Sequence, residues 1–204
     1  MKNLLPEGMT GQDYYRLYLY LHILNECTPE DEVLEIGCGD GEGPAAQGPP
    51  LIAEKVYDYV CIDKRRYNNP PFNFVQADIE EYGLTGVYDK VIALYVIQYV
   101  DPEKLFSLVS ERLKPGGVAY FSEGCQWYLD GPRLPAREMC NKTRWVLKKA
   151  FNSVEIKGIN DGIIVPEEKA TTGVFAICTN KTKEFLSNQI RYWSPDDGWM
   201  YGRM

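Results

Sequence analysis

The sequence predicts an α/β sandwich, in which helices cover a mostly parallel central sheet. Short apolar runs alternate along the chain with amphipathic segments of helical spacing, the pattern of a layered α/β fold. The first of these runs leads directly into a glycine-rich stretch, as buried strands do when a ligand-binding loop follows. With 204 residues, 45% of them hydrophobic, the chain is long enough for one domain with a sizeable core.

The first predicted element is a helix over residues 11–27. Apolar side chains recur at helical spacing in Tyr14, Leu17, Tyr18, Leu21 and Leu24. Thr10 or Asp13 is suited to cap its start, and Thr28-Pro29 ends it. Two roles stay open for this helix. It packs on the sheet, or it forms a lid over a ligand, with Tyr14, Tyr15 and Tyr18 toward the pocket.

The stretch that organises the chain is residues 33–43. Val33, Leu34 and Ile36 form a short buried strand that is interrupted by one acid, Glu35. Glycines then occupy every second position, namely Gly37, Gly39, Gly41 and Gly43. This spacing does not fit the G-x-G-x-x-G pattern of dinucleotide folds. It indicates a loop in which the backbone turns tightly and lets a ligand approach closely.

The connection after the glycines is expected to be long. Pro49 and Pro50 are tolerated only in a first helical turn, so the next helix is predicted to begin near Pro49 and to cover 51–55. Residues 56–62 form the second strand, which ends at Asp63. A carboxylate at this place can accept hydrogen bonds from both hydroxyls of a ribose, and the alternative is that Asp63 caps the following turn.

The middle of the chain continues the alternation. Residues 72–77 form the third predicted strand, followed by Asp78 and Ile79. The fourth strand and its exit lie within 88–100, and Asp101-Pro102 caps a helix with apolar residues at Leu105, Leu108, Val109 and Leu113. Lys114-Pro-Gly-Gly117 stops that helix, and 118–122 is the fifth strand.

Over residues 31–123 the chain resembles class I S-adenosylmethionine-dependent methyltransferases. The resemblance rests on the motif E-x-G-x-G-x-G after the first strand, on the acids after the second and third strands, and on the Asp-Pro helix that ends at L-K-P-G-G. The resemblance implies a three-layer Rossmann-like fold with a seven-stranded, mostly parallel sheet and an antiparallel edge strand. It implies one methyltransferase domain over 1–204, with an N-terminal helical lid in 1–30 and an aromatic tail in 181–204.

The resemblance also implies how the cofactor is held. Asp63 is expected to hold the ribose with Lys64 beside it, and Asp78 and Ile79 to hold the adenine, since a carboxylate accepts from an exocyclic amine. The methionine part is expected to be bound by the glycine loop, by Glu35 and by backbone carbonyls at the end of the fourth strand. These residues are Glu35, Gly37, Cys38, Gly39, Gly41, Ala93 and Leu94. The product is S-adenosylhomocysteine, and no metal is expected.

The sequence gives weaker indications of the residues that contact the methyl acceptor. Expected acceptor contacts are Tyr15, Tyr95 and Trp127, with Gln98, Tyr99 and Glu123 as catalytic candidates. Methyl transfer is an in-line displacement, so alignment suffices and no nucleophilic side chain is required. Many relatives carry a histidine near the position of Tyr99, and such a base is absent here. If a base is needed, Glu123 is the best-placed carboxylate, provided that burial raises its pKa; otherwise it caps the following loop.

Asn69-Pro-Pro-Phe72 matches the N-P-P-F motif of methyltransferases that act on adenine or on glutamine amides. In those enzymes the motif follows the fourth strand, near the transferred methyl. Here it follows the second strand, shortly after Asp63. We therefore interpret it as a proline-rich loop without a catalytic role.

The last third of the chain is expected to complete the sheet. Residues 134–150 form an amphipathic helix that is basic on one face, which is either solvated or in contact with an acidic substrate. Residues 153–156 and 173–179 are the last two strands, which pair antiparallel in the resembling fold, and 158–172 is a flexible loop between them. The aromatic tail packs on the body or forms an interaction surface.

The composition of the chain argues against several classes of function. The net charge of −7 argues against a broad nucleic-acid footprint. The six scattered cysteines suggest reduced, buried thiols in a cytoplasmic protein, and with a single histidine, His22, a zinc or iron site is not expected. There is no signal-peptide pattern and no apolar run of membrane-spanning length. The predicted acceptor is a small molecule, and the alternatives are a binding protein that has lost catalysis, or an RNA or protein methyltransferase. The acceptor and the oligomeric state cannot be inferred from the sequence.

Overall fold

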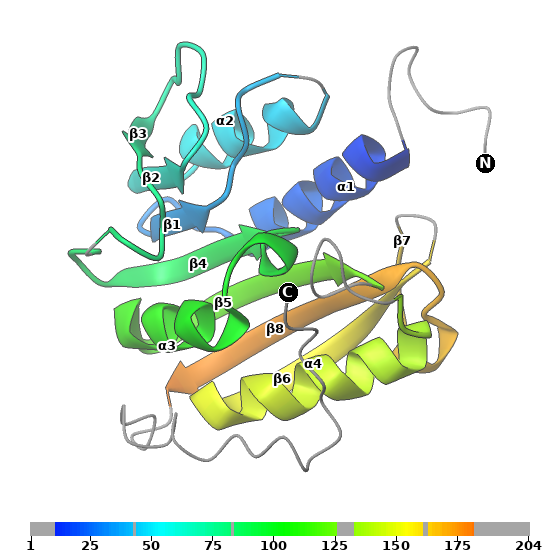
Figure 1. The fold of residues 1–204 in the computed structure, drawn as a ribbon. Helices are drawn as coiled ribbons and strands as arrows, with labels where there is room; N and C mark the ends of the chain where they lie inside the picture. Colours follow the sequence, from blue (N-terminus) through cyan, green and yellow to red (C-terminus); the bar gives the residue numbers. More distant parts are fainter. Residues whose placement is uncertain (1–10, 43, 83, 126–132, 161–162, 182–204) are drawn as a thin grey trace.

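The computed structural model of the chain describes residues 11–42, 44–82, 84–125, 133–160 and 163–181. Its centre is a sheet with eight strands among these residues, in the order β3-β2-β1-β4-β5-β8-β6-β7 (Figure 1). The strands are β1 (Glu32–Ile36), β2 (Asp58–Asp63), β3 (Asn73–Gln76), β4 (Tyr88–Leu94), β5 (Leu113–Gly124), β6 (Phe151–Asn160), β7 (Ile163–Val165) and β8 (Gly173–Lys181). Strands β1 to β5 are parallel, whereas β8 runs antiparallel to both β5 and β6.

Helices lie on both faces of the sheet (Figure 1). The α-helices are α1 (Gly11–Glu26), α2 (Gly48–Ala53), α3 (Pro102–Arg112) and α4 (Ala136–Ala150), and the short 3-10 turns are η2 (Pro44–Gln47), η3 (Ile97–Tyr99) and η4 (Glu167–Lys169). Buried side chains of α1 and α2 pack with Val33 and Ile92 in one core, and those of α3 and α4 pack with Leu34 and Val91 in the other. The predicted three-layer α/β fold is confirmed.

Local sequence explains the elements nearest the site. The apolar residues of β1 are almost fully buried because strands flank it on both sides and helices cover both faces. Helix α3 begins where predicted, since the Asp101 carboxylate accepts hydrogen bonds from the backbone N–H groups of Glu103 and Lys104. Because β1 lies between β2 and β4, the order of the strands reverses there, and their carboxyl ends open a crevice.

Several details differ from the predictions, and β6 for example covers residues 151–160 instead of 153–156. The sheet has one strand more than the predicted seven, because the β-branched residues 163–165 form β7 inside the expected loop. The connection after β1 is folded into η2 and α2, with Pro49 and Pro50 in the first turn of α2 as their geometry requires. Strand β5 begins at Leu113 instead of 118, directly after α3. None of the described helices is long and apolar enough to cross a membrane.

Candidate functional site

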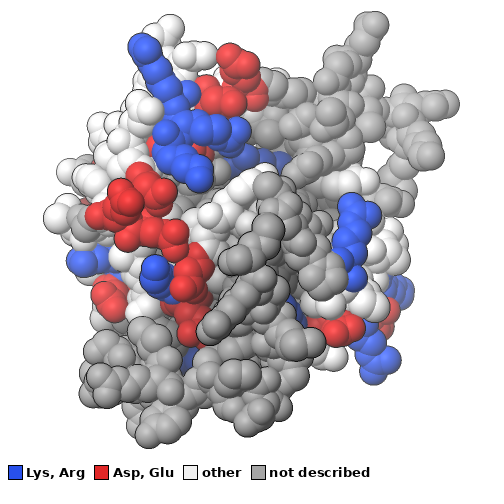
Figure 2. All heavy atoms as spheres, in the orientation of Figure 1, with Lys and Arg blue, Asp and Glu red and all other residues white. Residues whose placement is uncertain are grey.

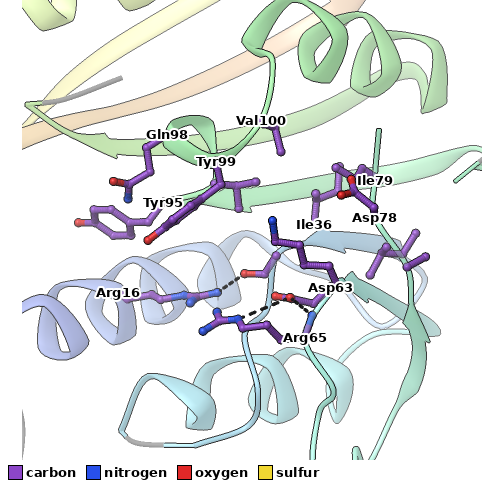
Figure 3. Close-up of a pocket in the computed structure, with 15 residues that line it drawn as sticks. Arg16, Ile36, Asp63, Arg65, Asp78, Ile79, Tyr95, Gln98, Tyr99 and Val100 are labelled. Carbon is purple, nitrogen blue, oxygen red and sulfur yellow. Dashed lines mark hydrogen bonds and ion pairs between the residues drawn. The ribbon is translucent and has the colours of Figure 1, made fainter. Parts of the chain in front are cut away.

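A cleft of about 420 Å³ lies at the carboxyl ends of β1, β2 and β4 (Figure 3). Its volume is in the range of small-molecule sites. The described residues that line it are Arg16, Ile36, Gly37, Ile62, Asp63, Lys64, Arg65, Ala77, Asp78, Ile79, Tyr95, Val96, Gln98, Tyr99 and Val100. Eight of them, namely Gly37, Asp63, Lys64, Asp78, Ile79, Tyr95, Gln98 and Tyr99, were predicted as site residues.

The glycine loop forms one wall because its backbone runs close to its neighbours. Gly37 has a φ of +80°, and a Cβ added there would lie 2.3 Å from a methyl carbon of Val96, so only glycine fits. Its N–H donates to the Ile62 carbonyl at 2.7 Å. Gly39 has a φ of +92° and lies beside the side chains of Arg16 and Arg65, whereas Gly41 packs on the ring of Tyr67.

Asp63 lies where β2 ends, buried but at the cleft wall. One carboxylate oxygen accepts the N–H of Gly39 at 2.7 Å, and the other accepts the N–H of Arg65 at 2.8 Å. The predicted capping role is therefore present. Each oxygen keeps a further lone pair, so the carboxylate can still accept from a ligand.

The far end of the cleft is formed by the residues after β3. Ala77, Asp78 and Ile79 line it, with Val100 opposite (Figure 3). One oxygen of Asp78 accepts the N–H of Glu80 at 3.0 Å. An acid beside apolar side chains provides one hydrogen-bond acceptor and a surface for a flat, partly apolar ring.

The segment after β4 forms the opposite wall. Tyr95 has a φ of +59°, uncommon for a residue other than glycine, and its N–H donates to the Ser122 carbonyl at 2.9 Å. Burial raises the pKa of Tyr95, so it stays a neutral phenol. Gln98 and Tyr99 follow in η3. Ala93 and Leu94 are buried and lie behind this wall, so the cleft begins one residue later than we expected.

Glu123 lies behind η3 and is almost fully buried. Its carboxylate accepts the N–H groups of Gln98 at 3.1 Å and of Gly124 at 2.8 Å. Burial raises its pKa to about 8, although these two hydrogen bonds favour the charged form. Glu123 is not among the described residues that line the cleft; it connects the end of β5 to the turn that carries Gln98.

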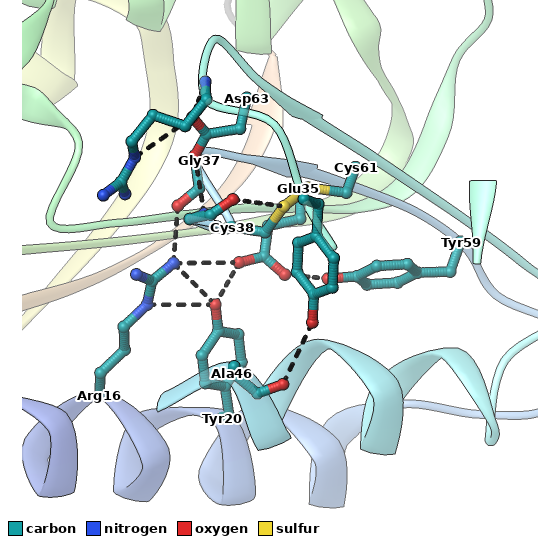
Figure 4. The surroundings of a disulfide bond; sticks show 12 residues. Arg16, Tyr20, Glu35, Gly37, Cys38, Ala46, Tyr59, Cys61 and Asp63 are labelled. Carbon is teal, nitrogen blue, oxygen red and sulfur yellow. Dashed lines mark hydrogen bonds and ion pairs between the residues drawn. A yellow bond between two sulfur atoms is a disulfide. The ribbon is translucent and has the colours of Figure 1, made fainter. Parts of the chain in front are cut away.

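Glu35 is also buried behind the loop, in a polar cluster with residues of α1 and β2 (Figure 4). The hydroxyls of Tyr20 and Tyr59 donate to its two carboxylate oxygens, and Arg16 Nη2 lies 3.5 Å from one of them. Burial raises the pKa of Glu35 to about 7 despite the positive charge of Arg16. Arg16 also donates to the Gly37 carbonyl at 2.6 Å, so this cluster joins helix α1 to the glycine loop.

Cys38 and Cys61 form a disulfide, which corrects the expectation that all six cysteines are reduced (Figure 4). Cys38 lies between Gly37 and Gly39, and Cys61 lies on the neighbouring strand β2, paired in register with Glu35. The two sulfurs come together because β1 and β2 are adjacent, which spacing along the sequence could not indicate. Of the other cysteines, Cys27, Cys140 and Cys178 are buried thiols and Cys125 is partly exposed.

This geometry has a counterpart among known families. A family model described as "Methyltransferase domain" matches residues 12–156, which is more than half of the chain. The chain belongs to this methyltransferase family. Comparison with curated proteins finds no matching sequence.

Solved structures of methyltransferases share the fold. The N-methyltransferase NodS from Bradyrhizobium japonicum WM9, in complex with S-adenosylhomocysteine, superposes with a TM-score of 0.53 at 16% identity, over 85% of this chain and 89% of that chain. A putative methyltransferase in complex with the Haloferax volcanii Trm112 activator gives 0.61 at 14% identity, over 84% and 92%. Phosphoethanolamine N-methyltransferase 2 of Haemonchus contortus, with phosphomonomethylethanolamine and S-adenosylhomocysteine, gives 0.58 at 16%, over 80% and 52%. At such identities the likeness is one of fold: the chain has the class I methyltransferase fold.

Six of the predicted cofactor residues are not among the described residues that line the cleft, namely Glu35, Cys38, Gly39, Gly41, Ala93 and Leu94. Tyr15 lies near enough to Tyr95 to affect its titration but is not part of the described lining. Trp127 lies outside the described residues, as do the aromatic tail from 182 and the first ten residues of the predicted lid.

Sequence reasoning missed two basic residues of the cleft, Arg16 and Arg65. Arg16 lies on the same helical face as Tyr20, four residues on, and this pairing was the available signal. Arg65 directly follows the Asp63-Lys64 pair. Its contact with Gly39 depends on the turn after β2, which no motif specifies.

Proposed function

We propose that this protein transfers a methyl group from S-adenosylmethionine to an N, O or S atom of a small-molecule acceptor. The observation that supports this most strongly is the order of groups along one cleft. Arg16, which donates to the Gly37 carbonyl, lies at one end, Asp63 in the middle, and Asp78 with Ile79 at the other end (Figure 3). This order corresponds to the methionine, ribose and adenine parts of the cofactor, and the cleft volume suits a ligand of that size.

In this proposal, the residues that line the cleft contact the cofactor and those behind it hold the wall in shape. Asp63 accepts from the ribose hydroxyls, Lys64 flanks the ribose, and Asp78 accepts from the adenine amine while Ile79 packs on the ring. The residues with supporting positions are Glu35, Cys38, Gly41, Ala93 and Leu94. Glu35 acts through Arg16 and Tyr20, because all three belong to one hydrogen-bonded cluster.

When bound, the cofactor supplies an electrophilic methyl group on its sulfonium. The acceptor then lies against Tyr95, Gln98 and Tyr99, which orient it toward that methyl and exclude water. Neither a neutral phenol nor an amide is a strong base near pH 7, so these side chains act by alignment. Tyr15 and Trp127 are proposed as further acceptor contacts, and Glu123 holds the turn that carries Gln98.

A small-molecule acceptor is favoured by the net charge of −7 and by the cleft volume of about 420 Å³, which is in the range of small-molecule sites. NodS and the Haemonchus enzyme are N-methyltransferases, which agrees with an amine as one of the possible acceptors. Among the described residues, no group of three or more His, Cys, Asp or Glu side chains is arranged to hold a metal ion, and the expectation that no metal is used stays a prediction. A cytoplasmic location is likewise a proposal.

One observation favours a second candidate, a methyltransferase-like protein that binds a partner without catalysis. The connection between β1 and α2 covers residues 37–47 and contains the turn η2, and the enlarged loop that the sequence predicts here motivates this candidate. The putative methyltransferase in the Haloferax complex is bound to an activator protein, which agrees with a role for such interactions in related folds.

Two experiments separate these functions. Calorimetry should detect binding of S-adenosylmethionine and S-adenosylhomocysteine. Absence of binding at high micromolar ligand would exclude the proposed methyl-transfer activity. A screen of metabolite pools with methyl-labelled cofactor then identifies the acceptor. Cofactor binding without labelled product in any pool, alone or with cellular protein added, would favour the binding protein.

A further inference from the structure

Two guanidinium groups converge on the face of Gly39, at one end of the cleft. A Cβ added to Gly39 would lie 3.5 Å from Arg65 Nη2 and 3.7 Å from Arg16 Nη1. Arg16 comes from helix α1 and Arg65 from the turn after β2, so two separate elements place like charges beside the same backbone position (Figure 3).

The other nitrogens of each group are already bound. Arg16 uses Nε and Nη2 for Tyr20, Glu35 and the Gly37 carbonyl. Arg65 Nη1 lies 3.4 Å from an Asp40 oxygen, and its Nε lies 3.7 Å from Asp63. Among the described residues, neither Arg16 Nη1 nor Arg65 Nη2 has a hydrogen-bond partner, and these are the two nitrogens beside Gly39.

Such an arrangement suits a small planar anion. A carboxylate can accept hydrogen bonds from both groups at once, and a charge between them offsets their mutual repulsion. The basic character is local, because Asp40 and Asp63 lie 3.4 Å and 3.7 Å from Arg65, and Figure 2 shows Lys and Arg side chains with Asp and Glu side chains directly beside them on the face drawn. A mixed surface of this kind favours a small anion over an extended polyanion.

We propose that Arg16 and Arg65 together bind the carboxylate at the methionine end of the cofactor. This inference rests on the proposed function. The pair lies on the glycine-loop side of Asp63, whereas Asp78 and Ile79 lie at the far end. A ligand whose ribose is at Asp63 and whose adenine is at Asp78 therefore extends its remaining part toward Gly39. Arg16 is mostly enclosed, whereas Arg65 is 58% exposed and has two of its nitrogens beside Asp40 and Asp63.

The test compares S-adenosylhomocysteine with its decarboxylated analogue, which keeps the amine and lacks only the carboxylate. Both are titrated calorimetrically into the wild type, Arg65→Gln, Arg16→Gln and Arg66→Gln. The wild type should prefer the carboxylate-bearing ligand by about tenfold to a hundredfold, the scale of hydrogen bonds to a charged group. Arg65→Gln should reduce this preference by about threefold to tenfold, because an exposed charge contributes less. Arg66→Gln, an exposed arginine outside the described lining, is the matched control and should leave it unchanged.

The ratio of the affinities for S-adenosylhomocysteine and its decarboxylated analogue distinguishes carboxylate binding from indirect effects. If Arg65→Gln shifts Asp63, both ligands should weaken equally, and an unchanged preference would overturn the proposal. Equal affinity of the wild type for both ligands would overturn it as well, while leaving the proposed function intact. No binding of either ligand would reject the proposed function itself. Arg16→Gln also leaves Glu35 without its cation, so thermal unfolding of each variant is needed to establish that the fold is kept. Because Arg65 does not contact Glu35, the result for Arg65→Gln decides the outcome.

Discussion

The backbone N–H of Gly39 donates to the Asp63 carboxylate at 2.7 Å, which connects the loop after β1 to the end of β2. A second N–H, from Arg65, holds the other oxygen of the same carboxylate at 2.8 Å. Two fixed donors orient the carboxylate. Asp63 is therefore already arranged to accept further hydrogen bonds when a ligand enters the cleft.

Asp63→Ala should weaken binding of S-adenosylmethionine by about 1–3 kcal/mol, the scale of lost hydrogen bonds to a charged group. Calorimetry measures the change. Asp58→Ala is the matched control, since Asp58 lies at the opposite end of the same strand. An unchanged affinity in Asp63→Ala would mean that the ribose lies elsewhere.

The contrast between Asp63 and Glu35 illustrates what the sequence could predict. Periodicity and the glycine spacing placed both acids correctly, one within β1 and one at the end of β2, because local patterns determine strands. They could not reveal that Tyr20 and Tyr59 surround Glu35, since these contacts join α1 and β2 to β1. The Cys38–Cys61 disulfide and the convergence of Arg16 and Arg65 were missed for the same reason.

Asn69→Ala should leave turnover nearly intact, because the N-P-P-F segment lies between β2 and β3 and none of its residues is among the described residues that line the cleft. Asn69 has a φ of +49°, so alanine should cost stability, about 1 kcal/mol, whereas Asn69→Gly should not. Steady-state kinetics and thermal unfolding check the two parts. A fall in kcat of about 10³ with unchanged cofactor affinity would instead indicate an amino-methyltransferase site.

Cys61→Ala should lower the free energy of unfolding by about 3 kcal/mol, because the disulfide closes a sequence separation of 23 residues. A dithiol reductant should produce a similar loss in the wild type and none in the variant. Thermal unfolding with and without reductant measures both. Cys140→Ala, which removes a buried free thiol, is the control and should keep its response to reductant. Six titratable thiols in the denatured, unreduced wild type would contradict the prediction.

Tyr99→Phe should lower kcat/KM by about tenfold to a hundredfold, through misalignment of the acceptor, and leave cofactor affinity unchanged. Tyr99 lines the cleft and is 55% exposed, so its hydroxyl can reach a ligand. Tyr57→Phe, at an exposed tyrosine outside the described lining, should have no effect. A parallel loss of cofactor affinity in Tyr99→Phe would place this hydroxyl at the cofactor instead.

Glu123 should make the stability depend on pH. Its pKa is raised from an ordinary 4.5 to about 8 in the folded protein, so the native state binds a proton that the unfolded chain has released over this range. The stabilisation is fully present below pH 4.5 and is lost as pH rises through about 8, on the order of 5 kcal/mol in total. Chemical unfolding of Glu123→Gln between pH 5 and 9 should therefore show a weaker decline than the wild type. Part of the decline should persist, because the pKa of Glu35 is raised to about 7.

The same variant decides whether Glu123 acts as a base. A carboxylate base is active only when ionised, so a wild-type rate that rises with pH toward about 8 and a large loss in Glu123→Gln would support that role. The contacts favour a different result. Glu123 reaches the cleft only through the Gln98 N–H, and a glutamine oxygen can still accept that hydrogen bond. We therefore expect Glu123→Gln to retain most of its kcat with a flat pH–rate profile, whereas Glu123→Ala, which frees the turn, should lower kcat/KM and leave cofactor affinity unchanged.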